Sequence, residues 1–203
     1  MRDGERQVAP TLAGIRRDHV ARYEFAARVM GKGSRVIDFA CGVGYGTKIL
    51  ADAGHKPIGY DIDPEAIAYA KEHYQGVGLV PGFRIGNGDA PEGLEECDVA
   101  VCFETIEHIE DPRPLLKALR AAAPALIASV PNESVMPWRR EDGATTLYHY
   151  RHYTSAEFNA LLEECGWRVV EWNGQLGPES EVEEGANGRT LPLRIWALSL
   201  GDG

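Results

Sequence analysis

Two carboxylates and a histidine, Glu104, Glu107 and His108, follow one another at spacings i, i+3 and i+4. If a helical turn begins at Glu104, the three side chains share one face of it. The histidine can then act as a general base, or as part of a pocket for the reacting molecule. His149 or His152, later in the chain, would complete a divalent-metal site with them. A structural role also stays open, in which Glu107 and His108 only cap and pack the turn.

A glycine-rich turn lies further toward the N-terminus, after a short apolar run at residues 35–39. The run is typical of a buried strand, and Asp38 lies near its end. Ala40, Gly42 and Gly44 follow, and helical character resumes at Thr47. Because glycines let the backbone bend tightly and let a ligand approach it closely, the pattern predicts a ligand-binding turn.

Acids follow three consecutive predicted strands: Asp38, Asp61 and Asp89. Each alone is equally compatible with a helix cap or a turn, which is the role we expect for Asp63. Together they fit a nucleoside, because an acid about 20 residues after the glycine turn accepts the hydroxyl protons of a ribose. Ile62 would lie against a purine face, and Asp89 would accept a proton from the exocyclic amine of adenine.

The spacing of the glycines separates two classes of nucleotide ligand. A dinucleotide site needs Gly-x-Gly-x-x-Gly facing a pyrophosphate, whereas this turn has Gly42-x-Gly44-x-Gly46. Asp38 would repel a pyrophosphate and would suit an ammonium group. S-adenosylmethionine carries both an ammonium and a sulfonium, so the sequence predicts it as the cofactor.

Four stretches of the chain resemble motifs of the class I S-adenosylmethionine-dependent methyltransferases. They are the glycine motif at 38–46, with Ala40 where the family usually has its first glycine, the ribose motif at 59–64, the adenine-amine motif at 88–90 and the motif after the fourth strand at 103–112. The last is similar to that of the subgroup containing the ubiquinone-pathway O-methyltransferases. The resemblance covers residues 35–131 well and 154–167 loosely.

This resemblance implies a set of site residues. The expected cofactor-binding residues are Asp38, Ala40, Gly42, Gly44, Asp61, Ile62, Asp89, Ala90, Phe103 and Glu104. The expected catalytic residues are His108, Glu104 and Glu107. A Glu-x-x-Glu-His pattern with a later histidine also occurs in metal-dependent small-RNA 3′-end 2′-O-methyltransferases, which would make Glu104, Glu107, His108, His149 and His152 metal ligands.

Strands and helices alternate along the chain, which favours an α/β fold with a doubly wound, mostly parallel sheet. Seven strands are expected, at 35–39, 57–61, 83–87, 97–103, 125–130, 167–172 and 193–200. Helices are expected at 16–30, 45–53, 63–74, after Pro112, and at 154–165. The family resemblance implies a Rossmann-like methyltransferase fold with an antiparallel last strand. We expect one domain, 1–203, with an N-terminal helix cap at 1–30, a substrate lid at 132–153 and a mobile acidic loop at 173–192.

Composition narrows the classes of partner. The chain of 203 residues has 44% hydrophobic and 26% charged residues, and it contains no apolar run of membrane-spanning length. The N-terminus lacks the apolar core of a secretory signal, and the four cysteines form no Cys-x-x-Cys pair, so a cytoplasmic protein is expected. A net charge of −10 disfavours a nucleic-acid partner.

The expected reaction is methyl transfer from S-adenosylmethionine to a small-molecule acceptor, at an oxygen. Aromatic residues and arginines in the predicted lid, among them Trp138, Arg139 and Tyr148, suit a planar, sugar or anionic acceptor. Two alternatives stay open: metal-dependent 2′-O-methylation of an RNA 3′ end, and a non-catalytic S-adenosylmethionine-binding partner of a larger assembly. The oligomeric state is also left open.

Overall fold

The computed structural model describes residues 6–76, 78, 80–89, 91–139, 145, 148–177, 179–185 and 190–195. Its strands form one sheet in the order β3-β2-β1-β4-β5-β8-β6-β7. Five strands are parallel: β1 (Arg35–Phe39), β2 (Lys56–Asp61), β3 (Gly82–Ile85), β4 (Val99–Phe103) and β5 (Leu126–Pro131). Strand order reverses between β1 and β4, which is where an open α/β sheet binds its ligand, at the carboxyl ends of the strands.

The remaining strands are antiparallel to their neighbours. The last strand, β8 (Thr190–Ile195), pairs with both β5 and β6 (Glu171–Gly174), and the two-residue β7 (Glu183–Glu184) pairs with β6. The expected antiparallel last strand is therefore present, although it lies between two other strands and not at the sheet edge. The sheet has eight strands where seven were expected, because β7 is added.

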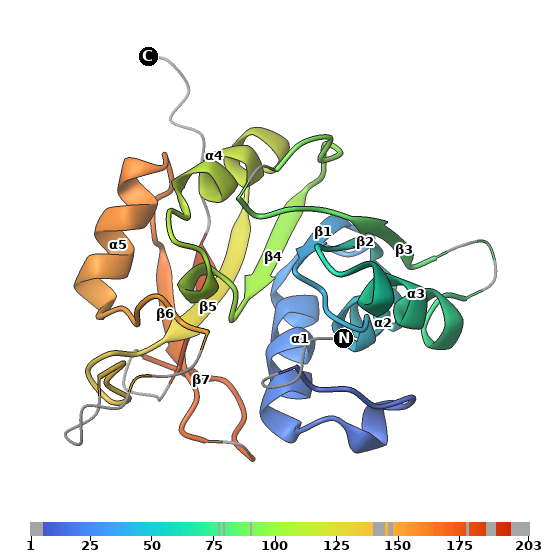
Figure 1. The fold of residues 1–203 in the computed structure, drawn as a ribbon, viewed down its shortest axis with the longest axis horizontal. Coiled ribbons are helices and arrows are strands. Elements are labelled where there is room, and N and C mark those ends of the chain that lie inside the picture. The colour runs from blue at the N-terminus through green and yellow to red at the C-terminus, as the bar shows by residue number, and fades with distance from the viewer. Residues whose placement is uncertain are drawn as a thin grey trace.

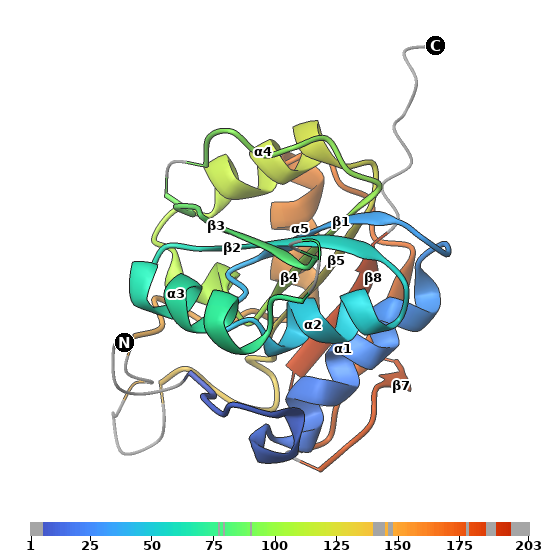
Figure 2. The ribbon, with the colours of Figure 1, turned by 90° about the vertical axis from the view of Figure 1, so that its right-hand side faces the viewer.

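Helices cover both faces of the sheet, as Figures 1 and 2 show. On one face lie α1 (Arg17–Val29), α2 (Tyr45–Asp52) and α3 (Pro64–His73), and on the other lie α4 (Arg113–Ala122) and α5 (Ser155–Glu164). Alternate residues of β4 serve the two faces: Val99 and Val101 pack toward α1 to α3, whereas Ala100 and Cys102 pack toward α4 and α5. Both faces of the central strands are therefore buried.

Local signals set the starts of the helices where they were expected. Asp63 accepts a hydrogen bond from the Glu65 amide at 2.9 Å, with Pro64 in the first turn of α3. Thr154 and Glu157 form a reciprocal capping box at the start of α5. Two short 3₁₀ helices lie at Leu12–Gly14 and at η3 (Ile106–His108).

One expectation about the C-terminal part is wrong. Trp167 does not begin the sixth strand; it is buried, and its indole donates to the Leu116 carbonyl at 3.0 Å, so the strand starts only at Glu171. Residues 173–192 contain the end of β6, the short β7 and the start of β8, and Gln175 among them is 2% exposed and donates to the carbonyls of Asp18 and Ser180. The mobility of this acidic segment stays a prediction. The expected seventh strand extends into residues 196–200, which lie outside the described residues.

Within the part of the chain described above, no helix combines the length and apolar character needed to cross a membrane.

Candidate functional site

The glycine turn (residues 40–46) connects β1 to α2 at the point where strand order reverses. Ala40, Gly42 and Gly44 have φ values of 60°, 57° and 91°, which is the left-handed region. A Cβ at Gly44 would also lie 2.7 Å from the Cβ of Ala70, so glycine is required there for space as well as for conformation. Ala40 adopts the same region with a side chain present, and it therefore carries backbone strain.

Asp61, at the end of β2, faces the glycine turn and is 3% exposed. Its Oδ2 accepts from the Gly42 amide at 2.8 Å, and its Oδ1 accepts from the Asp63 amide at 3.0 Å. Arg6 adds a third contact, with Nη2 3.0 Å from Asp61 Oδ1 and Nη1 2.7 Å from Asp63 Oδ2. The carboxylate expected to hold the ribose is therefore held in place by the turn and covered by an arginine.

The expected adenine contacts lie nearby at the surface. Ile62, next to Asp61, is 57% exposed, and Ile85, which pairs with Asp61 across β2 and β3, is 63% exposed. Exposed apolar side chains beside a polar anchor suit the face of a purine. Asp89 is exposed, and its amide donates to the Asn87 side chain at 3.0 Å. Ala90 lies outside the described residues.

Asp38 is fully buried beneath the glycine turn. It accepts hydrogen bonds from Tyr23 Oη of α1 at 3.0 Å and from Thr47 Oγ1 of α2 at 2.6 Å. Burial raises the pKa of the Asp38 carboxyl to about 7, against the opposing effect of these two hydrogen bonds. Asp38 thus ties α1 and α2 to β1, and its contact with a cofactor ammonium stays a prediction.

Glu104 follows β4 in a left-handed conformation, with φ of 47°. Its amide donates to the Ser129 carbonyl of β5 at 3.1 Å, and its Oε1 accepts from Ser129 Oγ at 2.6 Å. Phe103, just before it, is buried, and its ring meets that of Tyr23 edge to face at 5.1 Å. The positive φ turns the chain out of the sheet, which is strain of the kind found at functional sites.

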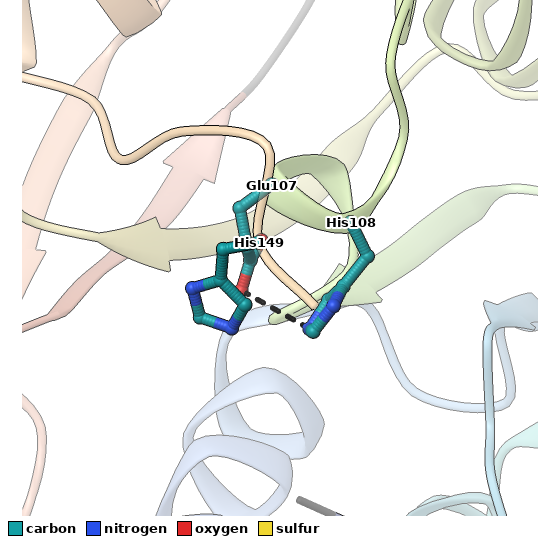
Figure 3. A group of neighbouring side chains, drawn as sticks. All are labelled: Glu107, His108 and His149. Carbon is teal, nitrogen blue, oxygen red and sulfur yellow. Dashed lines mark ion pairs between the residues drawn. The ribbon is translucent and has the colours of Figure 1, made fainter. Parts of the chain in front are cut away.

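Glu104 does not share a helical face with Glu107 and His108, so that expectation is wrong. The helical turn is η3, which begins only at Ile106, because the left-handed backbone of Glu104 cannot be part of a right-handed helix. His149 takes its place beside the other two (Figure 3). One ligand atom from each of Glu107, His108 and His149 lies within 4.8 Å of the others, and we name this group the histidine site.

The predicted lid brings His149 to η3. The segment starts and ends side by side, because Asn132 and Tyr153 form an isolated bridge after β5. The Tyr150 amide donates to the Glu107 carbonyl at 2.8 Å, and the Trp138 indole donates to the His149 carbonyl at 3.1 Å. Residues 140–144, 146 and 147 of the lid, Arg140 among them, lie outside the described residues.

The three members of the histidine site have different surroundings. Glu107 is fully buried, with Oε1 3.9 Å from His108 Nε2, and the two imidazole rings meet edge to face at 4.4 Å. Burial lowers the pKa of His149 to about 4, with further lowering by His108 and His152. His152 lies behind His149, with its Nε2 2.7 Å from His149 Nδ1. Glu104 and His152, both expected as metal ligands, lie outside the group.

Several site residues were missed from the sequence. Tyr23 and Thr47 were expected only as helix residues, and no local pattern connects Arg6 with Asp61. His19 of α1 was also missed; its Nδ1 lies 2.8 Å from Tyr45 Oη, next to the glycine turn. Burial and the charge of Arg22 lower the pKa of His19 to about 3, so this imidazole is neutral.

Comparison with known proteins assigns the chain to a family. The model of a methyltransferase domain family matches residues 13–172. A probable S-adenosylmethionine-dependent methyltransferase of Mycolicibacterium smegmatis is 31% identical over 84% of this chain and 66% of its own length. A ubiquinone biosynthesis O-methyltransferase of Methylococcus capsulatus is 30% identical over 57% of this chain and 48% of its own length. The chain thus spans about half to two thirds of these relatives.

Among solved structures, a possible histamine N-methyltransferase of Thermotoga maritima matches with a TM-score of 0.72 at 16% identity, over 90% of each chain. That likeness shows the α/β Rossmann-like methyltransferase fold. The chain belongs to the methyltransferase domain family. Its relatives include a probable S-adenosylmethionine-dependent methyltransferase, so S-adenosylmethionine is the cofactor expected for this chain.

Proposed function

We propose that this enzyme methylates a hydroxyl oxygen of a small-molecule acceptor, with His108 as the general base. The observation that carries the proposal is the hydrogen bond between His108 Nδ1 and the Tyr148 carbonyl, at 3.1 Å. A carbonyl can only accept, so Nδ1 carries the proton, and Nε2 of the neutral ring has the lone pair. His108 Nε2 is then able to take the proton of an acceptor hydroxyl.

The cofactor would be held by this chain's strand ends. Asp61 would bind the ribose hydroxyls, Ile62 would contact the adenine, and Asp89 with Ala90 would bind its amine. The backbone at Ala40, Gly42 and Gly44 would lie along the cofactor, next to Phe103 and Glu104, and Asp38 would face the ammonium. These residues suit the cofactor, because the Gly42 amide donates to Asp61 Oδ2 at 2.8 Å and so holds the carboxylate beside the glycine turn. When bound, S-adenosylmethionine supplies an activated methyl group on its sulfonium.

The protein's own part in the reaction is alignment and proton removal. Holding two reactants in line can lower a barrier by about 7–11 kcal/mol. A positioned base adds a rate factor of about 10²–10⁴. A hydroxyl must lose its proton as it becomes an ether, so a base with an available lone pair supports an oxygen acceptor. Glu107, fully buried beside His108, would stabilise the imidazolium that forms.

A second candidate is a metal-dependent methyltransferase, and the histidine site favours it. Two imidazoles and one carboxylate are suitable ligands for Zn²⁺, Mn²⁺ or a similar ion, and one ligand atom of each already lies within 4.8 Å of the others. The ion would be bound by Glu107, His108 and His149, where it would polarise an acceptor hydroxyl. Methylation of an RNA 3′ end belongs to this candidate, although the net charge of −10 counts against an RNA substrate.

A screen with methyl-labelled S-adenosylmethionine tests both candidates. We expect the isolated chain to label hydroxylated small molecules with and without a chelator, and His108→Gln to lower kcat by about 100-fold or more. Unchanged kcat in His108→Gln would overturn the base role. Activity lost on chelation and restored by Mn²⁺ would replace it with the metal candidate. Cofactor binding without activity on any acceptor would indicate a non-catalytic partner.

A further inference from the structure

A chain of two hydrogen bonds leads from the lid backbone to the histidine site. His152 Nδ1 lies 2.6 Å from the Met136 carbonyl oxygen, and His152 Nε2 lies 2.7 Å from His149 Nδ1. His152 is 6% exposed, and its ring centroid lies 4.9 Å from that of His149. His152 thus contacts the histidine site through His149.

When both imidazoles are neutral, their hydrogen-bond partners fix where the protons lie. The Met136 carbonyl can only accept, so His152 Nδ1 carries a proton and donates it. A neutral imidazole has one N–H, so His152 Nε2 is an acceptor. His149 Nδ1 must then carry a proton and donate it to His152, which leaves the lone pair of His149 on Nε2.

This tautomer is the less favoured one of a free neutral histidine, which prefers its proton on Nε2. The surroundings of His149 thus select the tautomer that the free ring populates less. The backbone of His149 is fixed as well, since its carbonyl accepts from the Trp138 indole and its neighbour Tyr148 has a φ of 75°.

The selected state matches that of His108. There the Tyr148 carbonyl holds Nδ1–H, so both imidazoles place their lone pairs on Nε2. The Glu107 carboxylate lies 3.9 Å from His108 Nε2. The histidine site therefore presents three electron-pair donors: Nε2 of His108, Nε2 of His149 and the Glu107 carboxylate. Such a site recognises a cationic or proton-donating group, either a metal ion or an acceptor hydroxyl.

We propose that His152 is a positioning residue that fixes the tautomer of His149, and not a ligand of the site itself. The proposal rests on the proposed function of the histidine site. Hydrogen-bond partners behind metal-binding or catalytic histidines commonly act in this way, and their loss lowers metal affinity or activity about 10–100-fold.

Two amide variants separate positioning from a general structural role. The Gln side chain places its carbonyl oxygen near the position of imidazole Nε2, so His152→Gln can still accept from His149. The shorter Asn side chain reaches only the position of Nδ1, so His152→Asn keeps the Met136 contact and loses His149. Both are neutral amides, and circular dichroism with thermal unfolding would show that both fold.

The test is long-range ¹H–¹⁵N correlation of the metal-free protein at pH 8, which distinguishes Nδ1–H from Nε2–H imidazoles. His149→Gln assigns the His149 signals by their absence. We expect Nδ1–H at His149 in the natural protein and in His152→Gln, and Nε2–H in His152→Asn. Nε2–H in the natural protein, or an unchanged tautomer in His152→Asn, would overturn the proposal.

Titration with Co²⁺, followed by its absorption spectrum, gives the second measurement. We expect His152→Asn to weaken Co²⁺ binding about 10–100-fold and His152→Gln to weaken it by less than about threefold. Equal loss in both variants would contradict a positioning role. If the natural protein binds no Co²⁺, the metal candidate fails, whereas the tautomer measurement still decides the role of His152.

Discussion

Arg6 lies on the Asp61 carboxylate at the end of β2, with Nη2 3.0 Å from Oδ1. This is the carboxylate expected to accept the ribose hydroxyls, so the guanidinium and the cofactor compete for the same oxygen. Partly exposed ion pairs contribute about 0.2–1 kcal/mol. We expect Arg6→Ala to bind S-adenosylhomocysteine about two- to fivefold more tightly in calorimetry.

The matched control for Arg6→Ala is Arg35→Ala, which removes an ion pair with Asp98 at the start of β1, the other end of the strands. Its cofactor affinity should equal that of the natural protein. Weaker binding in Arg6→Ala would show that Arg6 stays over the bound cofactor and helps to hold it.

Asp61 and Asp63 are neighbouring acids with different expected roles. Asp61→Ala should weaken S-adenosylhomocysteine binding by about tenfold or more, because it removes the acceptor for two hydroxyl groups. Asp63→Ala removes a helix cap and should cost about 1 kcal/mol of unfolding free energy with little loss of affinity. Equal affinities for the two variants in calorimetry would remove the ribose role of Asp61.

The buried Asp38 should give the stability an unusual pH dependence. Its folded pKa of about 7 lies above that of an unfolded aspartate, about 3.9, so the folded state holds the proton longer as pH rises. The contribution of Asp38 to the free energy of unfolding is therefore fully present below about pH 4 and is lost as pH rises from 4 to 7. Above about pH 7 it changes no further. Asp38→Asn has no carboxyl to ionise and should not lose stability in this way. The Tm of Asp38→Asn minus that of the natural protein should therefore increase from pH 4 to pH 7.

Asp98 provides a control of opposite sign for the pH experiment. Hydrogen bonds from Arg35 lower the pKa of the Asp98 carboxyl, so its contribution is present above the unfolded pKa and is lost as pH falls. Asp98→Asn should be less stable than the natural protein at neutral pH, and this difference should close below about pH 4. If the Tm difference between Asp38→Asn and the natural protein did not change from pH 4 to pH 7, Asp38 would be ionised over this whole range.

Ala40 has a side chain at a left-handed position, where glycine is strain-free. Since the left-handed region costs a residue with a Cβ about 1–2 kcal/mol, Ala40→Gly should raise the free energy of unfolding by about 0.5–1 kcal/mol in urea denaturation. Ala53→Gly is the control, because Ala53 has φ of −75° and should be destabilised by glycine. Destabilisation of both variants alike would mean that Ala40 carries no relievable strain.

The sequence predicted those parts of the fold and site that depend on short-range chemistry. The caps at Asp63 and Thr154 and the acid at the end of β2 are set by neighbouring residues, and they were found. Contacts between residues far apart in the sequence were not predicted. Arg6 reaches Asp61 across the molecule, the lid folds back so that His149 meets η3, and pairing with β8 and β7 decides where β6 begins and ends.

Glu104 shows a different limit. The i, i+3, i+4 pattern of Glu104, Glu107 and His108 assumes regular helical geometry, and a single left-handed residue removes that assumption. Hydrogen bonds with Ser129 on the neighbouring strand β5 hold Glu104 in this conformation. The grouping of Glu104 with Glu107 and His108 on one helical face is therefore wrong, and the roles of the three residues stay predictions.

A crystal structure of the protein with S-adenosylhomocysteine bound is the most direct test of the cofactor site at the three strand ends. The ribose hydroxyls should contact the Asp61 carboxylate, Arg6 should have moved off Asp61 Oδ1, and the adenine should lie on Ile62. A structure in which Arg6 remains 3.0 Å from Asp61 Oδ1 and the ribose contacts other residues would contradict it.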